Sequence, residues 1–212
     1  NDISSILDEN GVWVMEQSYL PLLIKDLSFD SICHEHLAYY GLKQIKIAAN
    51  SANLKVFNVE TNNMNGGSLR AFLCHANSNR SSNNDNLKRI EKLELDSKIN
   101  EPSTFINFKE KIIRLGDKLV NFIKQEKRKG KSIHIYGAST KGNVLLQLFG
   151  IGNDLIDAAA ERNKWKYGHR TPGTNIPIIS EKESRELNPD YYLVLPWHFK
   201  EEFIKREQEF IN

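Results

Sequence analysis

The sequence predicts an α/β protein with a parallel sheet in its carboxyl-terminal part. After position 131, short apolar runs alternate with helical patterns, which favours parallel strands joined by right-handed crossovers. The first 80 residues are instead rich in strand patterns, and a long helical pattern lies between the two parts. We therefore expect three regions, at residues 1–80, 81–130 and 131–212.

The amino-terminal region has the patterns of core strands. A helix-like pattern and an Asn10-Gly11 turn precede an apolar strand at residues 12–15, an opening that predicts a fold whose beginning is missing. Residues 54–60 alternate as a half-buried strand does, and residues 68–74 could pair with them. The Asn- and Gly-rich residues between these strands predict a loop, because both residue types accept positive φ.

The middle region reads as helical. A Ser- and Asn-rich stretch, residues 77–86, predicts an exposed loop before it. Apolar residues then recur at three- and four-residue spacing, which places them on one helix face. Glu101-Pro102-Ser103 interrupts the pattern, so two helices are expected between Leu87 and Arg128.

The carboxyl-terminal region repeats a strand–loop–helix theme. Ser180 and Glu183 have the spacing of a capping box, which opens a helix. A helix is also expected to begin at Val144, and another to close the chain at residues 200–210. Strands are predicted at residues 132–136, 155–160, 176–179 and 191–195.

Composition narrows the class of protein. A hydrophobic fraction of 40% suffices for a packed core, and a formal net charge of +2 argues against a protein that coats nucleic acid. Two cysteines without CxxC spacing predict a reduced, cytoplasmic setting rather than a disulfide framework. No apolar run approaches the roughly 18 residues of a membrane span, so no membrane contact is expected.

The segment FDSICHEHLAYY, residues 29–40, gathers titratable groups. Histidine changes charge near neutral pH, and Glu35 between His34 and His36 can orient an imidazole, so acid–base catalysis is one interpretation. If the segment were a strand, His34 and His36 would share a face and could bind a metal, as in a metal-dependent hydrolase. No third ligand has supporting spacing, so no metal site is predicted. A structural role for hydrogen-bonded imidazoles stays open.

Three further segments follow predicted strands, where open α/β sheets bind ligands. GASTKGN, residues 137–143, combines glycines, which allow close backbone approach, with a helix amino terminus, which attracts anions. It matches neither the Walker A nor the GxGxxG motif. The alternative interpretation is an ordinary turn between a strand and a helix. Residues 161–174 interleave cations with two aromatics, which suits a nucleotide or else a solvated basic loop. Residues 196–199 are a third candidate, or a hydrophobic plug.

Several of these motifs resemble one family in their order and over nearly the whole chain. FDSICHEHLAYY, NNMNGGSLR, GASTKGN, ERNKWKYGHRTPGTNIPI and YYLVLPWHFKEEF are similar to segments of sugar C-methyltransferases that act on nucleotide-linked deoxyhexoses. The resemblance implies that residues 1–80 end an S-adenosylmethionine domain, residues 81–130 are a helical linker, and residues 131–212 form a Rossmann-like domain that binds the acceptor. The family's zinc-binding region and donor-binding glycine loop are not in this sequence.

The resemblance also assigns roles to residues. It implies that His36 is the general base and Glu35 its partner, with His34, Tyr39 and Tyr40 in support; Cys33 stands where many relatives have tyrosine. Nucleotide and sugar would be bound by seven residues at the strand ends: Ser139, Lys141, Asn143, Arg162, Lys166, Trp197 and His198.

The implied function is methyl transfer from S-adenosylmethionine to the carbanion of a nucleotide-linked keto-sugar or similar small molecule. The methyl-donor site would lie mostly outside this chain, in a missing amino-terminal domain, so this chain alone is expected to be inactive. The alternative is a non-catalytic module that binds nucleotide sugars.

Overall fold

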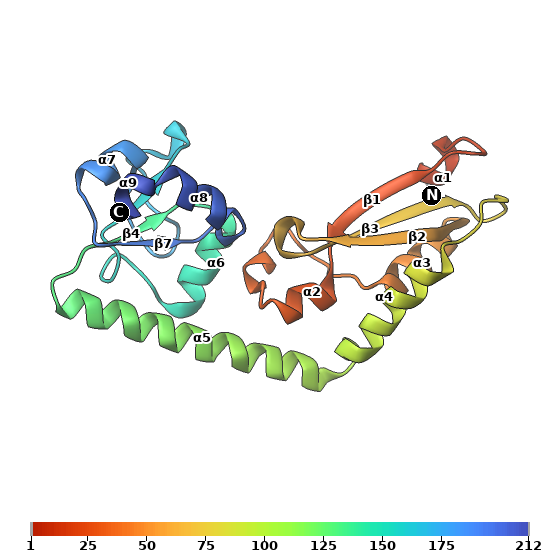
Figure 1. The fold of residues 1–212 in the computed structure, drawn as a ribbon, viewed down its shortest axis with the longest axis horizontal. Coiled ribbons are helices and arrows are strands. Elements are labelled where there is room, and N and C mark those ends of the chain that lie inside the picture. The colour runs from red at the N-terminus through yellow and green to blue at the C-terminus, as the bar shows by residue number, and fades with distance from the viewer. Residues whose placement is uncertain (1, 212) are drawn as a thin grey trace. The chain divides into compact units, whose positions relative to one another are not determined.

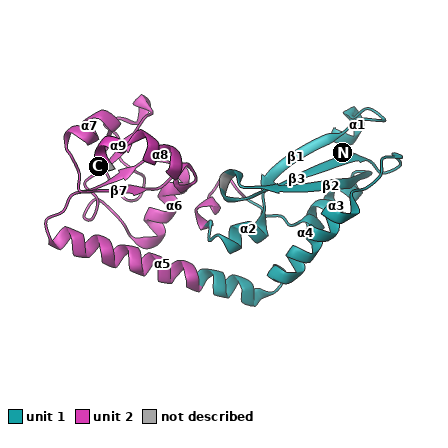
Figure 2. Cartoon of the chain, viewed as in Figure 1, with its two compact units in different colours: residues 1–28, 37–109 teal, residues 29–36, 110–212 magenta. Residues whose placement is uncertain are grey.

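The computed structural model describes residues 2–211, whose elements are labelled in Figure 1. The chain divides into two compact units (Figure 2). Unit 1 comprises the residues up to Ser28 together with Leu37–Lys109. Unit 2 comprises Glu110–Asn212 together with the short segment Phe29–His36, which interrupts unit 1 in the sequence.

Unit 1 contains a three-stranded antiparallel sheet in the order β1-β3-β2. The strands are β1 (Trp13–Ser18), β2 (Leu54–Asn62) and β3 (Ser68–His75), close to their predicted positions, although β1 begins one residue later and ends three residues later. The loop expected between β2 and β3 contains a short 3₁₀ turn, η2 (Met64–Gly66).

Among the described residues, four helices lie entirely within unit 1: α1 (Asp2–Ile6), α2 (Leu20–Lys25), α3 (Leu42–Ser51) and α4 (Asn84–Ser97). Both α3 and α4 pack against β2, and the side chains of Leu42, Leu54, Leu69 and Ile90 close the core between helix and sheet. The sequence analysis did not anticipate α2 and α3. The apolar residues of α3 do recur at helical spacing, but Gly41 gives it no capping side chain of its own.

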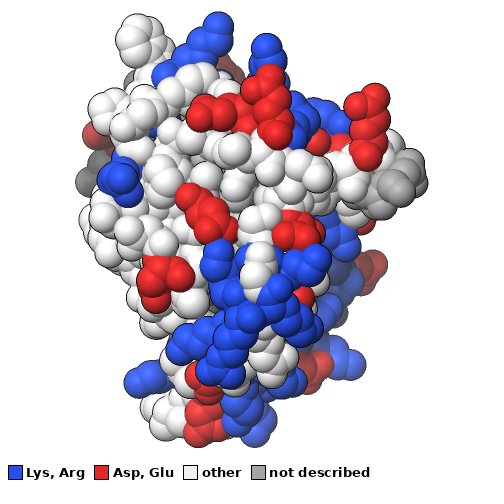
Figure 3. Space-filling view, turned by 90° about the vertical axis from the view of Figure 1, so that its left-hand side faces the viewer, with Lys and Arg blue, Asp and Glu red and all other residues white. Residues whose placement is uncertain are grey.

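The helix α5 (Pro102–Arg128) confirms the predicted break before it, with Pro at a first-turn position where no backbone hydrogen bond is lost. Basic side chains gather where α5 runs, in the lower part of the view in Figure 3. Three of them at its carboxyl end are already paired: Lys127 with Asp157, Lys129 with Glu126 and Lys131 with Asp190. The pairs with Asp157 and Asp190 fasten the end of α5 to the sheet that follows it, and the Lys129–Glu126 pair is local to the helix end.

Unit 2 contains a four-stranded, fully parallel sheet in the order β6-β5-β4-β7, which confirms the predicted α/β class. The strands are β4 (Ile133–Tyr136), β5 (Ala158–Glu161), β6 (Ile178–Ser180) and β7 (Tyr191–Val194). The prediction that β5 begins at Leu155 was wrong, because Leu155 and Ile156 fill the core from a turn before the strand. Along the chain, β5 and β6 are added on one side of β4, and β7 is then added on the other side. The order of the strands in the sheet therefore reverses between β4 and β7, while all four strands stay parallel.

The helices of unit 2 are α6 (Thr140–Phe149), α7 (Glu181–Glu186), α8 (Lys200–Arg206) and α9 (Gln208–Ile211). The start predicted for α6 at Val144 was four residues late, because Ser139 caps the helix by accepting a hydrogen bond from the Gly142 amide. The single helix predicted at residues 200–210 is broken at Glu207, a buried residue whose carboxylate binds Arg185. Ser180 caps α7 as predicted.

Three 3₁₀ turns complete unit 2: η1 (Phe29–Ser31), η3 (Lys164–Lys166) and η4 (Trp197–Phe199). The turn η1 contacts α6, and the rings of Phe29 and Phe149 lie 5.4 Å apart. Among the residues described, no helix has the length and apolar character needed to cross a membrane.

Candidate functional site

A cleft of about 400 Å³ lies in unit 2 at the carboxyl ends of β4, β5 and β7. This is the position at which the strand order reverses, where open α/β sheets leave a crevice for a ligand. One wall contains the turn after β4 and the residues that follow β5, and the other contains α8. Basic and acidic side chains both line it, among them Arg162, Lys166, Glu161, Glu202 and Arg206.

The turn after β4 brings the backbone close to the cleft. Gly137 has φ +89, and a Cβ there would lie 2.8 Å from the Pro196 ring, so both the conformation and the space favour glycine. Ser139 lines the cleft, but its hydroxyl is used as the cap of α6. Helix amino termini attract anions, and Ser139, which precedes α6, places this helix end beside the cleft.

The carboxylate of Glu161 holds the turn in place. It accepts hydrogen bonds from the amides of Ala138, Arg162 and Asn163 at 2.8–3.0 Å. Lys166 bridges the same elements, since its ammonium donates to the Ala138 carbonyl at 2.7 Å and to Glu161 at 3.2 Å. Burial opposes ionisation of Glu161, but the three amides and the Lys166 ammonium outweigh it and lower its pKa.

The opposite wall is a network of charged side chains. Arg185 donates two hydrogen bonds to Glu207, at 2.5 and 2.8 Å, and the Tyr136 hydroxyl donates to the same carboxylate at 2.6 Å. Arg206 binds the Tyr136 oxygen and pairs with Glu181 at 2.8 Å. Burial is the main cause that raises the pKa of Tyr136. The guanidinium of Arg206 is therefore engaged within the protein, while Arg162 extends from the other wall as an exposed cation.

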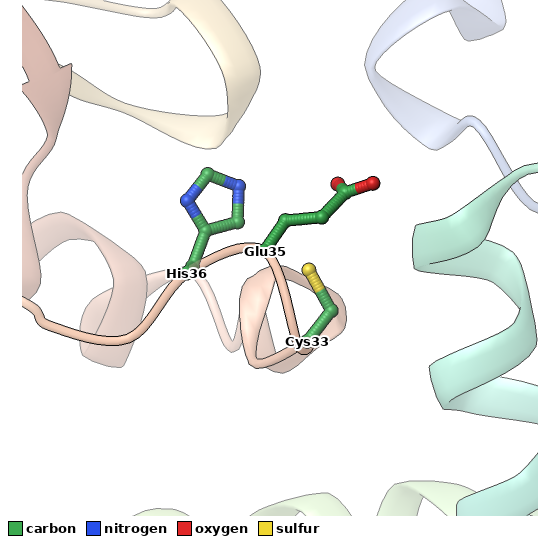
Figure 4. Close-up of side chains that lie close together, drawn as sticks. All are labelled: Cys33, Glu35 and His36. Atoms are coloured by element: carbon green, nitrogen blue, oxygen red, sulfur yellow. The ribbon is translucent and has the colours of Figure 1, made fainter.

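Residues 29–36 of the histidine segment belong to unit 2, as a turn rather than a strand, and its last four residues belong to unit 1. Figure 4 shows Cys33, Glu35 and His36 close together, and one potential ligand atom of each lies within 4.8 Å of the others. Glu35 and His36 are exposed. His34 is also exposed and approaches Glu35 at 4.0 Å, so the strand arrangement considered for His34 and His36 does not occur.

A buried carboxylate connects this segment to the end of β7. Asp30 is 5% exposed and accepts a hydrogen bond from the Trp197 indole at 3.2 Å. Its other neighbour is the ring of His198, at 3.9 Å. Burial lowers the pKa of His198, and Lys141 adds to this, while the Asp30 carboxylate opposes it.

The seven residues predicted to bind substrate fall into separate groups. Ser139, Arg162 and Lys166 line the cleft, whereas Trp197 and His198 contact Asp30. Lys141 and Asn143 lie in the first turn of α6, and the buried Asn143 side-chain oxygen has no hydrogen-bond partner in the described part of the chain. Tyr39, assigned with the histidine segment, is half-buried and belongs to unit 1.

Sequence reasoning did not single out several residues of the site. Glu161 could have been found from the sequence, because it is the first polar residue after the run of three alanines in β5, at the strand end where ligands bind. Asp30 stands inside the quoted histidine motif but was not assigned a role. Arg206 and Glu181 lie on helices that are far apart in the sequence, and no local sequence pattern predicts that they pair.

Comparison with known proteins is consistent with this architecture. Residues 63–212 match the family described as C-methyltransferase C-terminal domain. The chain is also 31% identical over all 212 residues to the C-methyltransferase NovU of Streptomyces niveus. The match covers 50% of that curated relative, so the chain spans about half of its length. The chain therefore belongs to the C-methyltransferase family, with a methyltransferase C-terminal domain that includes the parallel sheet and its cleft.

Proposed function

We propose that this chain is the acceptor-binding half of an S-adenosylmethionine-dependent C-methyltransferase that deprotonates a nucleotide-linked keto-sugar. The observation that carries the proposal is the cleft at the strand reversal of unit 2. It combines a glycine turn, a capped helix terminus and the exposed cation Arg162, which together suit a diphosphate. The same unit contains the segment of His36.

In this proposal the enzyme binds its substrate mainly through the nucleotide, which lies far from the reacting carbon of the sugar. Backbone amides at the start of α6 and the Arg162 guanidinium would neutralise the diphosphate, and Lys166 would stiffen the turn through its bond to Ala138. Trp197, His198, Lys141 and Asn143 would complete the binding surface around the neighbouring strand end. Binding energy from these remote groups would orient the sugar for reaction.

The chemical step begins with a proton on the carbon next to the ketone. The exposed His36 imidazole would accept that proton, and the C–H electron pair would move to the carbonyl to form an enolate. Glu35 would stabilise the imidazolium that results, and His34 and Tyr39 would support the site. The enolate carbon then has the electron pair needed to attack a methyl group.

The methyl donor would supply an electrophilic methyl group on a sulfonium centre. The described residues of unit 1 do not suit its pocket, because their sheet is antiparallel and presents no glycine-rich turn from a parallel strand into a helix. The proposal therefore assigns the donor site to sequence beyond these 212 residues, in the amino-terminal part of the protein.

Calorimetry tests the binding part of the proposal. Thymidine or uridine diphosphate titrated into the 212-residue chain should release or absorb measurable heat at millimolar ligand. Arg162→Ala should weaken binding about tenfold, the cost of losing one charge-assisted hydrogen bond. Arg114→Ala is the matched control, because Arg114 pairs with Glu110 on the surface of α5, outside the cleft, and should leave binding unchanged. No heat with either nucleotide would contradict the proposal.

Substitution of the proposed base tests the catalytic part. In the full-length protein, His36→Gln should reduce methyl transfer by at least about 100-fold while nucleotide affinity is retained, since general base catalysis contributes about that factor. His75→Gln is the control, because His75 lies in unit 1 and its ring contacts the Leu7 carbonyl. Undiminished methyl transfer by a folded His36→Gln protein would favour the alternative, a nucleotide-sugar binding module in which the histidine segment is structural.

A metal-dependent reaction would require an ion at the histidine segment. Cys33, Glu35 and His36 are close enough to share one, but two of the three are exposed. Elemental analysis of the purified chain should find less than stoichiometric zinc and iron under the proposed function. If stoichiometric metal is found and is lost in the His36→Gln protein, this segment binds a metal ion. A metal-dependent reaction would then replace the proposed acid–base mechanism.

A further inference from the structure

The 3₁₀ turn η1 is buried although the histidine segment that follows it is exposed. Phe29, Asp30 and Ser31 are 5%, 5% and 2% exposed. Burying a carboxylate is costly unless it is paired or hydrogen-bonded, so the location of Asp30 needs a reason. Phe29 packs on Phe149, an apolar contact that would bury this turn without any charge.

The partners of Asp30 both come from η4, immediately after β7. The Trp197 indole donates to its Oδ2 atom at 3.2 Å, and the His198 ring nitrogen Nε2 lies 3.9 Å from the same atom. The Asp30 Oδ1 atom and the His198 Nε2 atom are buried, and neither has a hydrogen-bond partner among the residues that the structure describes. One carboxylate therefore links the histidine segment to the strand end at which the cleft lies.

The remainder of the segment is held to η1 by its own backbone. The Ile32 amide donates to the Phe29 carbonyl at 2.8 Å, and the Cys33 amide to Ser31 at 3.1 Å. The His36 amide then donates to the Cys33 carbonyl at 3.0 Å. Successive short-range bonds of this kind make residues 29–36 a connected turn, so an anchor at Asp30 constrains the position of His36.

We propose that Asp30 is a positioning residue that fixes the His36 segment on the carboxyl-terminal unit through Trp197 and His198. The inference rests on the proposed role of His36 as base. It explains why residues 29–36 belong to unit 2 although the residues on both sides of them belong to unit 1. It also places the base on the same body as the cleft that would hold the nucleotide.

Hydrogen exchange of the 212-residue chain tests the anchor directly. In Asp30→Asn, the amides of Ile32, Cys33 and His36 should exchange on the order of tenfold faster, the effect of weakening one hydrogen bond to a charged group. Trp197→Phe, which keeps an aromatic ring but removes the indole N–H donor, should accelerate the same amides. Exchange in β4 and β5 should stay within about twofold of the unsubstituted chain.

Asp190→Asn is the matched control, since it makes the same change in the same unit. Asp190 binds the Ser132 amide at 2.8 Å and Lys131 at the amino ends of β4 and β7. Its substitution should leave exchange in residues 29–36 unchanged. Unaltered exchange of this segment in Asp30→Asn would overturn the inference, and so would equal acceleration throughout unit 2, which would make Asp30 a general stabiliser of the fold.

Kinetics in the full-length protein separate this inference from the proposed function. Asp30→Asn should lower kcat for methyl transfer about tenfold or more with a smaller change in KM, because the base is displaced while Arg162 and the start of α6 still hold the nucleotide. If His36→Gln abolishes transfer and Asp30→Asn leaves kcat unchanged, only the positioning role fails. If His36→Gln has no effect, the proposed base fails, and the exchange experiment still decides whether Asp30 anchors the segment.

Discussion

Glu94 shows how much local structure a single side chain can determine. It lies in α4, is 8% exposed, and accepts hydrogen bonds from the Leu42 amide and, at 3.4 Å, from the Lys43 amide. These amides open α3, so the carboxylate serves as the cap that Gly41 cannot provide. The Tyr19 hydroxyl donates to the same carboxylate at 2.9 Å, and burial together with the Glu94 charge raises the pKa of Tyr19.

Glu94→Gln should destabilise unit 1 by about 2–3 kcal/mol, because charge-assisted hydrogen bonds to buried groups are replaced by weaker neutral ones. Urea denaturation followed by circular dichroism measures the change in the free energy of unfolding. Glu91→Gln on the same helix is the control, since Glu91 makes only a partly exposed pair with Lys46 and should change stability little. Equal effects of the two substitutions would contradict the capping role.

At the scale of whole elements, the packing of α5 against α6 supports the turn from which the histidine segment continues. A Cβ on Gly116 of α5 would lie 2.3 Å from the ring of Phe149, so glycine lets the end of α6 approach this helix closely. Phe149 in turn packs on Phe29 of η1. The glycine, the two rings and Asp30 therefore form one path from the linker helix to the histidine segment.

Gly116→Ala should destabilise unit 2 although alanine favours helix. The overpacking cost of about 1–3 kcal/mol is expected to exceed the gain of about 1 kcal/mol in helix propensity. Denaturant unfolding of the single variant and of the double variant with Phe149→Leu measures the balance. Because leucine is smaller than the ring, it should recover part of the loss in the Gly116→Ala background. Stabilisation by Gly116→Ala alone would show that Phe149 moves away at no cost.

Within residues 2–211, the buried apolar side chains form two hydrophobic cores. One lies between the antiparallel sheet and helices of unit 1, with Leu54 and Leu69 among its buried residues. The other surrounds the parallel sheet of unit 2, with Ile135 and Ala159 at its centre. The described residues of each core cluster belong to one unit only, so substitutions in the two cores have no shared partners.

The double variant Glu94→Gln, Gly116→Ala should therefore combine the two losses independently. Changes at distant sites add within about 0.5 kcal/mol when they share no contacts. Hydrogen exchange assigns each loss: Glu94→Gln should accelerate amides of β2 and β3, and Gly116→Ala those of β4 and β5. A coupling well above that limit, or acceleration in the other unit, would show that the units unfold together.

Patterns within short windows of the sequence predict most of the elements that the structure contains. Period-two alternation located β2, and the strand–loop–helix alternation predicted the parallel sheet. Ser180 and the glycine turn at Gly137 were recognisable because capping and positive φ depend on a few adjacent residues. The resemblance of whole motifs indicated the methyltransferase family, to which residues 63–212 belong. The roles assigned to His36 and its neighbours stay predictions.

The sequence by itself determined the α/β class, the succession of strands, and the family, because periodicity, caps and turn residues act over a few positions. Only the tertiary structure decided that Glu94 caps α3 from 52 residues away and that Asp30 meets Trp197, 167 residues further along the chain. It also decided which charges line the cleft and which are already paired. Such contacts depend on how folded elements pack. The residues next to a carboxylate in the sequence do not indicate which distant group will bind it.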